Sequence, residues 1–224
     1  MKIKILKLIC ILICFQFISC NKKIDTKSFY LNKQYQKEQN IEFVAIDSKD
    51  SHLWNIVQDK ENNQIITKRY NSKKELIDET TEQITENGSS LISYTLIKYD
   101  DTGEFKVPHL IKLYPEKKDL IKWDLENLST YSGEFIYKDV IYQLNRTRRF
   151  LKEENNQLIF HDTFHVESLS EVKDIHTEWL KEKLDFSQFS YYEKHKGLVK
   201  YSRIAYDGTE KIFEARNNNF IKVN

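Results

Sequence analysis

The chain has 224 residues, with 35 Lys and Arg against 34 Asp and Glu, for a formal net charge of +1 at pH 7. Removing residues 1–19 takes away three lysines and no acid, which leaves 35 − 3 = 32 basic residues against 34 acidic ones. This balance excludes a general nucleic-acid binder, which would carry a strongly basic face. Hydrophobic residues make up 40% of the chain, enough for the core of a single domain.

The N-terminal segment has the layout of a secretory signal peptide. Lys2, Lys4 and Lys7 form a basic start, and an almost entirely apolar run follows from Leu8 to Ile18. A helix needs about 20 apolar residues to cross the hydrocarbon core of a membrane, and this run is much shorter. We therefore expect residues 1–19 to be cleaved off rather than retained as a transmembrane anchor.

The segment ends in Phe17-Ile18-Ser19-Cys20, which resembles the lipobox of bacterial lipoproteins. It departs from the usual pattern at Phe17, where most lipoboxes have leucine. The resemblance implies that Cys20 is diacylated on its thiol, becomes the first mature residue, and is held in a membrane by fatty acids such as palmitate. Asn21 replaces the aspartate that retains many lipoproteins in the inner membrane, which favours the outer membrane. An ordinary cleaved signal peptide and an uncleaved anchor are the alternatives, and the membrane face stays open.

Cysteine usage agrees with lipidation. The chain has three cysteines, Cys10, Cys14 and Cys20, and none beyond position 20. The exported domain therefore has no internal disulfide, no thiolate nucleophile and no cysteine that could bind a metal. An unmodified Cys20 would be an unpaired thiol in an oxidising compartment, and acylation removes that thiol.

Residues 20–40 are rich in Asn, Lys and Gln, and we expect the lipidated cysteine and a flexible tether here, with a frayed helix around Phe29 to Tyr35. From residue 41 on, short stretches rich in β-branched and aromatic residues alternate with turn signals. The expected strands are Ile41–Ile46, Leu53–Gln58, Gln64–Tyr70, Glu75–Glu86, Ser89–Asp100, Phe105–Tyr114, Leu120–Leu125, Val140–Leu151, Gln157–Glu167, Leu198–Tyr206 and Glu210–Arg216. They predict a single, mainly β (α+β) domain over residues 41–224, an antiparallel meander that forms a curved sheet or open barrel.

Turn residues define the expected hairpins. Asn87-Gly88 and Asp207-Gly208 are typical of two-residue hairpin turns that need positive φ, and residues 153–156 indicate a longer hairpin loop. One stretch is ambiguous, because Ser72-x-x-Glu75 is a capping-box pattern that would begin a helix over residues 73–87. The β-branched residues of that stretch favour a hairpin instead.

One main amphipathic helix is expected over residues 169–184. Ser168-x-x-Glu171 is a second capping box at its start. Apolar residues then recur at helical spacing, namely Val172, Ile175 and Trp179, with Leu180 and Leu184 widening the stripe. We expect this helix to cover a face or mouth of the sheet and to bury Trp179 against it.

His161 and His165 are four residues apart, a spacing that would bring two imidazoles together for zinc on a helix. On a strand, four residues span about 13 Å, which is too far for one metal. The apolar residues of this stretch alternate with the histidines and are interrupted only by Asp162. The sequence therefore predicts a half-buried strand with both histidines on its wetter face, and no metal site.

Arg146 and Arg148 share one face of an expected strand, next to Arg149. The earlier residues on that face are apolar, so the face starts apolar and ends basic. Two guanidinium groups placed in this way could grip a phosphate or carboxylate of a ligand. The simpler interpretation is cross-strand pairing with an Asp or Glu of the protein itself, and both interpretations stay open here.

The chain contains no G-x-S-x-G, no H-E-x-x-H and no phosphate-binding glycine loop. Residues 197–201, followed by the Asp207-Gly208 hairpin, loosely resemble the closing strands of periplasmic half-barrels that carry lipids or lipoproteins. That resemblance implies a concave sheet that binds an apolar or amphipathic ligand, although the sequence singles out no ligand-binding residue.

We therefore expect a membrane-anchored, non-enzymatic envelope lipoprotein with no catalytic residue, no cofactor, no metal and no nucleic-acid partner. The alternative is a protein-interaction lipoprotein with a filled core, such as an inhibitor or immunity protein that binds another envelope protein. An envelope enzyme is the least expected of the three.

Replacing Cys20 with serine should abolish attachment to the membrane and slow removal of the signal peptide, because the thiol that receives the diacyl group is lost. Metabolic labelling with a fatty-acid analogue measures this directly. Equal labelling of wild type and Cys20→Ser would contradict the lipobox assignment.

Overall fold

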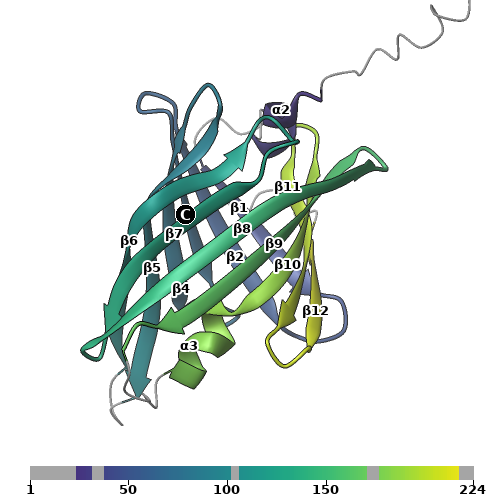
Figure 1. Cartoon of the computed structure of the whole chain (residues 1–224). Coiled ribbons are helices and arrows are strands. Elements are labelled where there is room, and N and C mark those ends of the chain that lie inside the picture. Colours follow the sequence, from purple (N-terminus) through teal and green to yellow (C-terminus); the bar gives the residue numbers. More distant parts are fainter. Residues whose placement is uncertain (1–23, 32–37, 102–105, 171–176, 217–224) are drawn as a thin grey trace, which may run out of the picture.

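The computed structural model describes residues 24–31, 38–101, 106–170 and 177–216. Within them, twelve antiparallel strands form one closed barrel (Figure 1). The strands are β1 (Glu38–Ala45), β2 (Ser51–Asp59), β3 (Gln64–Tyr70), β4 (Leu76–Ile84), β5 (Gly88–Asp101), β6 (Lys106–Lys122), β7 (Ser129–Tyr137), β8 (Val140–Glu154), β9 (Gln157–Ser168), β10 (Phe186–Glu193), β11 (Gly197–Ala205) and β12 (Glu210–Ala215). Helices α2 (Thr26–Tyr30) and α3 (Thr177–Leu184) lie at opposite ends of the barrel (Figure 1). No helix in the described ranges is long and apolar enough to cross a membrane.

Each strand pairs with its neighbours in the chain, and the first strand also pairs with the last. β1 meets β12 in the register Phe43 with Ala215 and Ala45 with Phe213. The prediction of a mainly β, antiparallel meander is confirmed. The sheet goes further than the expected curved sheet or open barrel, because the β1–β12 pairing closes it and leaves no edge strand in the described part of the chain.

Side chains alternate between the interior and the outer wall, as the two-residue period of a strand requires. In β10 every second residue is buried, starting at Phe186. In β8 the buried residues are Tyr142, Leu144, Arg146 and Arg148. The interior therefore receives aromatic and charged side chains as well as aliphatic ones.

The stretch 73–87 is a hairpin rather than a helix, as predicted, with β4 and β5 as its arms. Asn87-Gly88 was expected to form a two-residue turn with positive φ. This is wrong, since neither residue has a positive φ. Gly88 instead begins β5, and a Cβ there would collide with the carbonyl oxygen of Ile121 on β6. Glycine is needed for this close approach of two strands.

The tightest turns lie elsewhere. Asn155 and Asn156 have φ of 51° and 60° and join β8 directly to β9, so the longer loop expected over residues 153–156 is in fact a two-residue turn. In the β11–β12 connection Gly208 has the expected positive φ, 83°. The connection is longer than two residues, because β11 ends at Ala205 and β12 begins at Glu210.

Three strand assignments needed correction. The two strands expected over 105–114 and 120–125 are one strand, β6, whose pairing with β7 shifts register between Pro115 and Lys117. β7 and β10 were not expected. Their inward-facing positions mix aromatic residues with Ser, Gly and Gln, so neither has the apolar alternation that identifies a half-buried strand.

Residues 24–31 were expected to belong to a flexible tether, but they are folded onto one end of the barrel. Phe29 of α2 is only 6% exposed and belongs to an apolar cluster with Phe160 and Tyr192. The Thr26 hydroxyl donates to the Trp123 carbonyl at 3.0 Å. Further contacts tie α2 to β9, β10 and β11, so it covers part of this end.

At the other end, α3 confirms the C-terminal half of the predicted helix 169–184. Leu169 and Ser170 are not helical, and residues 171–176 lie outside the described ranges. Leu180 and Leu184 are the buried residues of α3. Trp179, which was expected to be buried, is half-buried at the margin of the same cluster, with its ring 5.9 Å from that of Tyr137.

Because Leu180 is 0% exposed, Leu180→Ala should lower the free energy of unfolding by about 2–5 kcal/mol. Lys181→Ala, one residue further on the exposed side of the helix, should change it by less than about 0.5 kcal/mol. Chemical denaturation compares the two variants, with Trp179→Ala expected between them. Equal midpoints for Leu180→Ala and Lys181→Ala would remove α3 from the core.

Candidate functional site

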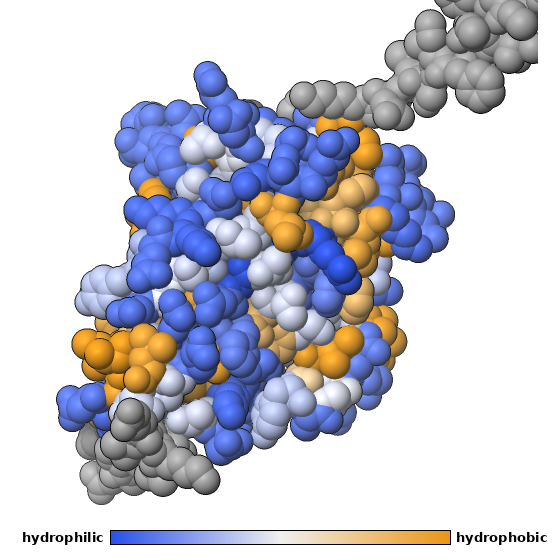
Figure 2. All heavy atoms as spheres, viewed as in Figure 1, coloured by the Kyte–Doolittle hydropathy of each residue, from blue (hydrophilic) through white to orange (hydrophobic). Residues whose placement is uncertain are grey.

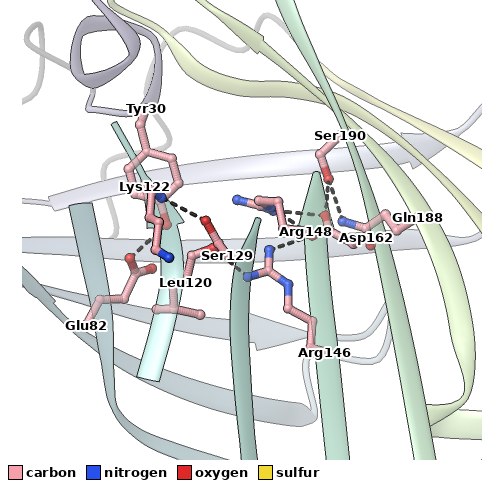
Figure 3. Close-up of polar contacts among 10 residues, drawn as sticks. All are labelled: Tyr30, Glu82, Leu120, Lys122, Ser129, Arg146, Arg148, Asp162, Gln188 and Ser190. Atoms are coloured by element: carbon pink, nitrogen blue, oxygen red, sulfur yellow. Dashed lines mark hydrogen bonds and ion pairs between the residues drawn. The ribbon is translucent and has the colours of Figure 1, made fainter. Parts of the chain in front are cut away.

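A buried ion network lies inside the barrel between β8 and β9 (Figure 3). Arg148 and Asp162 are direct cross-strand partners. Arg148 donates through Nε and Nη2 to the two Asp162 oxygens, at 2.7 and 2.9 Å. Arg146 Nη2 donates to Asp162 Oδ1 at 2.5 Å. One carboxylate is thus shared by two guanidinium groups.

Polar groups on neighbouring strands complete this network (Figure 3). The Ser190 hydroxyl donates to Asp162 at 3.1 Å, and Gln188 donates to Ser190 at 2.9 Å. Arg146 Nη1 donates to the carbonyl of Leu120 at 2.5 Å. Burial raises the pKa of Asp162, but the two arginines outweigh burial and hold that pKa below its usual value. Asp162 is therefore ionised at neutral pH.

The two arginines predicted to share a strand face do so, and their partner is an acid of the protein itself. Asp162 was visible in the sequence only as the residue that interrupts an apolar alternation. His161 and His165 lie on the outer wall, as predicted, where His161 stacks on Phe189 with ring centroids 4.7 Å apart. Among the residues that the structure describes, no group of three or more His, Cys, Asp or Glu side chains could hold a metal ion.

A second acid, Glu82, faces the interior near α2. It accepts a hydrogen bond from the Tyr30 hydroxyl at 2.7 Å (Figure 3). It accepts another from the Ser89 hydroxyl at 2.6 Å. Burial raises its pKa, although these hydrogen bonds act in the opposite direction. This contact ties the N-terminal helix to the barrel interior, and no sequence pattern predicted it.

A third charged cluster lies nearer α3. Arg69 on β3 and Asp78 on β4 are cross-strand partners, with Arg69 Nε 2.7 Å from Asp78 Oδ1. Arg203 on β11 lies over the Phe186 ring, 3.5 Å from its centroid, and donates to the carbonyl of Lys183 at 2.5 Å. Burial and, after it, the charge of Arg69 lower the pKa of Arg203 to about 10. Arg203 is still a cation at neutral pH.

These clusters surround a cavity of about 190 Å³ inside the barrel. A wider pocket of about 580 Å³ opens beside α3, between the helix and the ends of β2, β11 and β12. The cavity and the pocket share Leu96, Lys183 and Arg203 in their walls. Because they share these walls, we treat them as one site, an inner cavity with an outer mouth.

The predicted lipidation site, Cys20, lies outside the described residues. Comparison of the chain with protein-family models, with curated proteins and with solved structures finds no match. The functional argument therefore depends on the geometry of the site and on the sequence.

The mouth contains a pH-sensitive residue, His52, whose imidazole is 2.6 Å from the Tyr201 hydroxyl. Burial and the charges of Arg69 and Arg203 lower the pKa of His52 to about 4. In the unfolded chain its pKa is about 6.5, so only the unfolded state is protonated between those values. Stability should fall as the pH drops through this window, by about 3 kcal/mol in all.

His52→Gln removes this titration and should flatten the pH dependence of the free energy of unfolding between pH 7 and pH 4. Chemical denaturation at several pH values, on wild type and variant, measures the difference. Other titrating groups affect both proteins equally and cancel in it. Parallel curves would show that His52 is not buried as a neutral base.

Proposed function

We propose that this protein is a non-enzymatic bacterial envelope lipoprotein, anchored through Cys20, whose barrel binds a small amphipathic ligand. The lipobox-like segment supports the anchor, and Asn21 supports the outer membrane as its location. The single observation that carries ligand binding is the mouth beside α3, which shares walls with the inner cavity. Small-molecule sites are commonly concave, mostly apolar and about 300–1,000 Å³ in volume, and the mouth has that size.

The site favours an amphipathic ligand over a purely apolar one. The mouth offers Leu76, Leu96, Trp179 and Phe213 as apolar walls. Charged side chains line both spaces, among them Asp50 and Arg203 in the mouth and the buried arginines and acids in the inner cavity. An apolar ligand would leave the unpartnered Nε of Arg146 without an acceptor, which is costly, so a ligand with one polar end fits better.

The size of the inner cavity also limits what can enter it. At about 190 Å³ it is close to a cavity of about 150 Å³ that holds one benzene molecule. The two chains of a membrane lipid do not fit inside it, so the lipid-carrier function implied by the half-barrel resemblance is narrowed to short, single-chain molecules.

Binding without catalysis is supported by the state of the interior acids. Asp162 is shared by two arginines, Asp78 is paired with Arg69, and Glu82 accepts two hydrogen bonds. A catalytic carboxylate needs to reach the proton that it transfers. These three are occupied by contacts within the protein.

The short distance between the anchor and the barrel supports a defined orientation at the membrane. Ile24, the first described residue, comes four positions after Cys20, and four fully extended steps of the chain span about 14 Å at most. The α2 end would therefore face the lipid headgroups. The mouth lies beside α3, and α3 is at the opposite end of the barrel from α2 (Figure 1).

A protein-interaction lipoprotein is the second candidate, because the outer wall carries an exposed apolar strip. Ile136 on β7 and Ile141 on β8 are cross-strand neighbours, and both are exposed. Leu110, Tyr114 and Leu169 are exposed on the same or adjoining strand segments. Figure 2 shows apolar side chains gathered at the lower left of this face. Exposed apolar patches often mark protein–protein contacts.

Native mass spectrometry of the full-length protein, extracted gently from its own host, tests the proposal. We expect a retained molecule of small mass. Ala205→Trp fills the mouth and should abolish retention, since Ala205 lines the mouth. Tyr206→Trp is the matched control, because Tyr206 is 54% exposed, and it should retain the molecule.

Equal retention by both variants would place the ligand elsewhere. The second candidate would be favoured if the wild-type protein retains no small molecule but co-purifies with another protein. Ile136→Lys should then abolish that co-purification.

A further inference from the structure

More cations than anions line the cavity, with Arg146 and Arg148 buried and Arg69 and Arg203 half-buried. Its walls carry four arginines, Arg69, Arg146, Arg148 and Arg203, against three acids, Asp78, Glu82 and Asp162. Burial favours the neutral form of Glu82, which widens the excess. Lys183, at the rim, pairs with Glu182 outside. Uncompensated charge away from water is expensive, so an anion from outside the chain would be stabilised here.

The excess of positive charge is concentrated on Arg203. Its hydrogen bond among the described residues is to the Lys183 carbonyl. Asp78, the acid that acts on it, is already bonded to Arg69 through two guanidinium nitrogens. A guanidinium group has five N–H donors. Arg203 therefore has donors to spare at the point where the mouth meets the cavity.

Arg146 offers a second unsatisfied donor. Its side chain is 3% exposed, and Nη1 and Nη2 are bonded to Leu120 and Asp162. Its Nε is buried with no partner in the structure. A buried N–H without an acceptor costs about 1–3 kcal/mol, and a ligand oxygen would supply the missing acceptor.

A pair of stacked aromatic rings connects the two arginines. Arg146 lies over Phe164, and Arg203 lies over Phe186. The two rings stack on each other with centroids 4.3 Å apart. Both guanidinium groups are therefore held on one aromatic wall of the cavity, and both line the same space.

We propose that the cavity is an acid-binding site, in which Arg203 and the Nε of Arg146 bind the carboxylate or phosphate group of a short single-chain amphiphile. This inference depends on the proposed function and specifies its ligand, whose apolar end lies in the mouth. Guanidinium groups match both acids geometrically. The cavity fits a head with a chain of a few carbons rather than a membrane lipid.

Four molecules that share a hexyl chain and differ only in their head group test the proposal: heptanoate, hexyl phosphate, hexanol and hexylammonium. Equilibrium dialysis against the full-length lipoprotein in lipid nanodiscs, corrected with empty nanodiscs, gives each dissociation constant. We expect the two acids to bind at least about tenfold more tightly than hexanol, as charge-assisted hydrogen bonds require, and hexylammonium to bind most weakly. The tighter of the two acids identifies the natural head group.

Arg203→Gln should weaken the binding of the preferred acid to that of hexanol and leave hexanol unchanged. Lys200→Gln is the matched control, since it removes one positive charge from the same strand, where Lys200 pairs with Glu214. It should leave every affinity unchanged. Arg146 cannot be replaced without breaking the Asp162 network, so its Nε–H is followed by NMR. That signal should shift on adding the preferred acid and not on adding hexanol.

The possible failures are distinguishable. If the four molecules bind equally, amphiphile binding stands and the acid-binding site is overturned. If none binds, the proposed function fails as well. If inorganic phosphate binds as tightly as hexyl phosphate, the acid-binding site stands, but the apolar part of the ligand is refuted. Equal loss of binding by Arg203→Gln and Lys200→Gln would replace the specific contact with general charge attraction.

Discussion

The pairing of β1 with β12 is the interaction on which the rest of the structure depends, because it turns one face of a long meander into an enclosed interior. A barrel of about eight strands is just wide enough for its side chains to fill. Twelve strands leave a wider space, which aliphatic side chains do not reach across. Longer side chains, of Arg, Tyr and Phe, therefore occupy the interior. The size of the barrel thus accounts for the presence of buried charge.

Because the interior contains arginines, acidic side chains have to lie beside them to compensate their charge. The antiparallel register places Asp162 on β9 opposite Arg148 on β8. It likewise places Asp78 on β4 opposite Arg69 on β3. Such buried pairs are weak evidence for stability, because desolvation offsets most of the attraction. Their clearer effect is on position, since Arg146 and Arg148 are fixed by their bonds to Asp162. The unpaired Nε–H donor of Arg146 therefore has a defined position beside the cavity.

Local sequence signals predicted the parts of the fold that depend on neighbouring residues. The expected bounds of β3, Gln64–Tyr70, agree with the structure, and so do the shared face of Arg146 and Arg148 and the hairpin over residues 73–87. Barrel closure could not be predicted, because it pairs the two ends of the described domain. β7 and β10 were missed because their inner faces are partly polar.

The candidate site shows the same limit. Asp162 broke an apolar alternation and was therefore visible, but its partners follow only from the strand register. Arg203 looked like any charged residue in a C-terminal hairpin. Its importance comes from Phe186 and Lys183, which belong to other elements. The usable signal was a charged residue at a strand position whose side chain faces inward. That signal can be interpreted only once the closed barrel is known.

The two ends of the barrel differ in a way that limits what the protein can bind. With Cys20 as the anchor, as we propose, the α2 end lies against the membrane, and α2 covers part of that end through Phe29 and Tyr30. The mouth then opens at the far end, beyond strands such as β10, whose eight residues alone span roughly 20 Å along a tilted barrel axis. A ligand would reach it from the aqueous compartment rather than from the bilayer. It must therefore be soluble enough to leave the membrane, which agrees with the small cavity and the acidic head group that the arginines select.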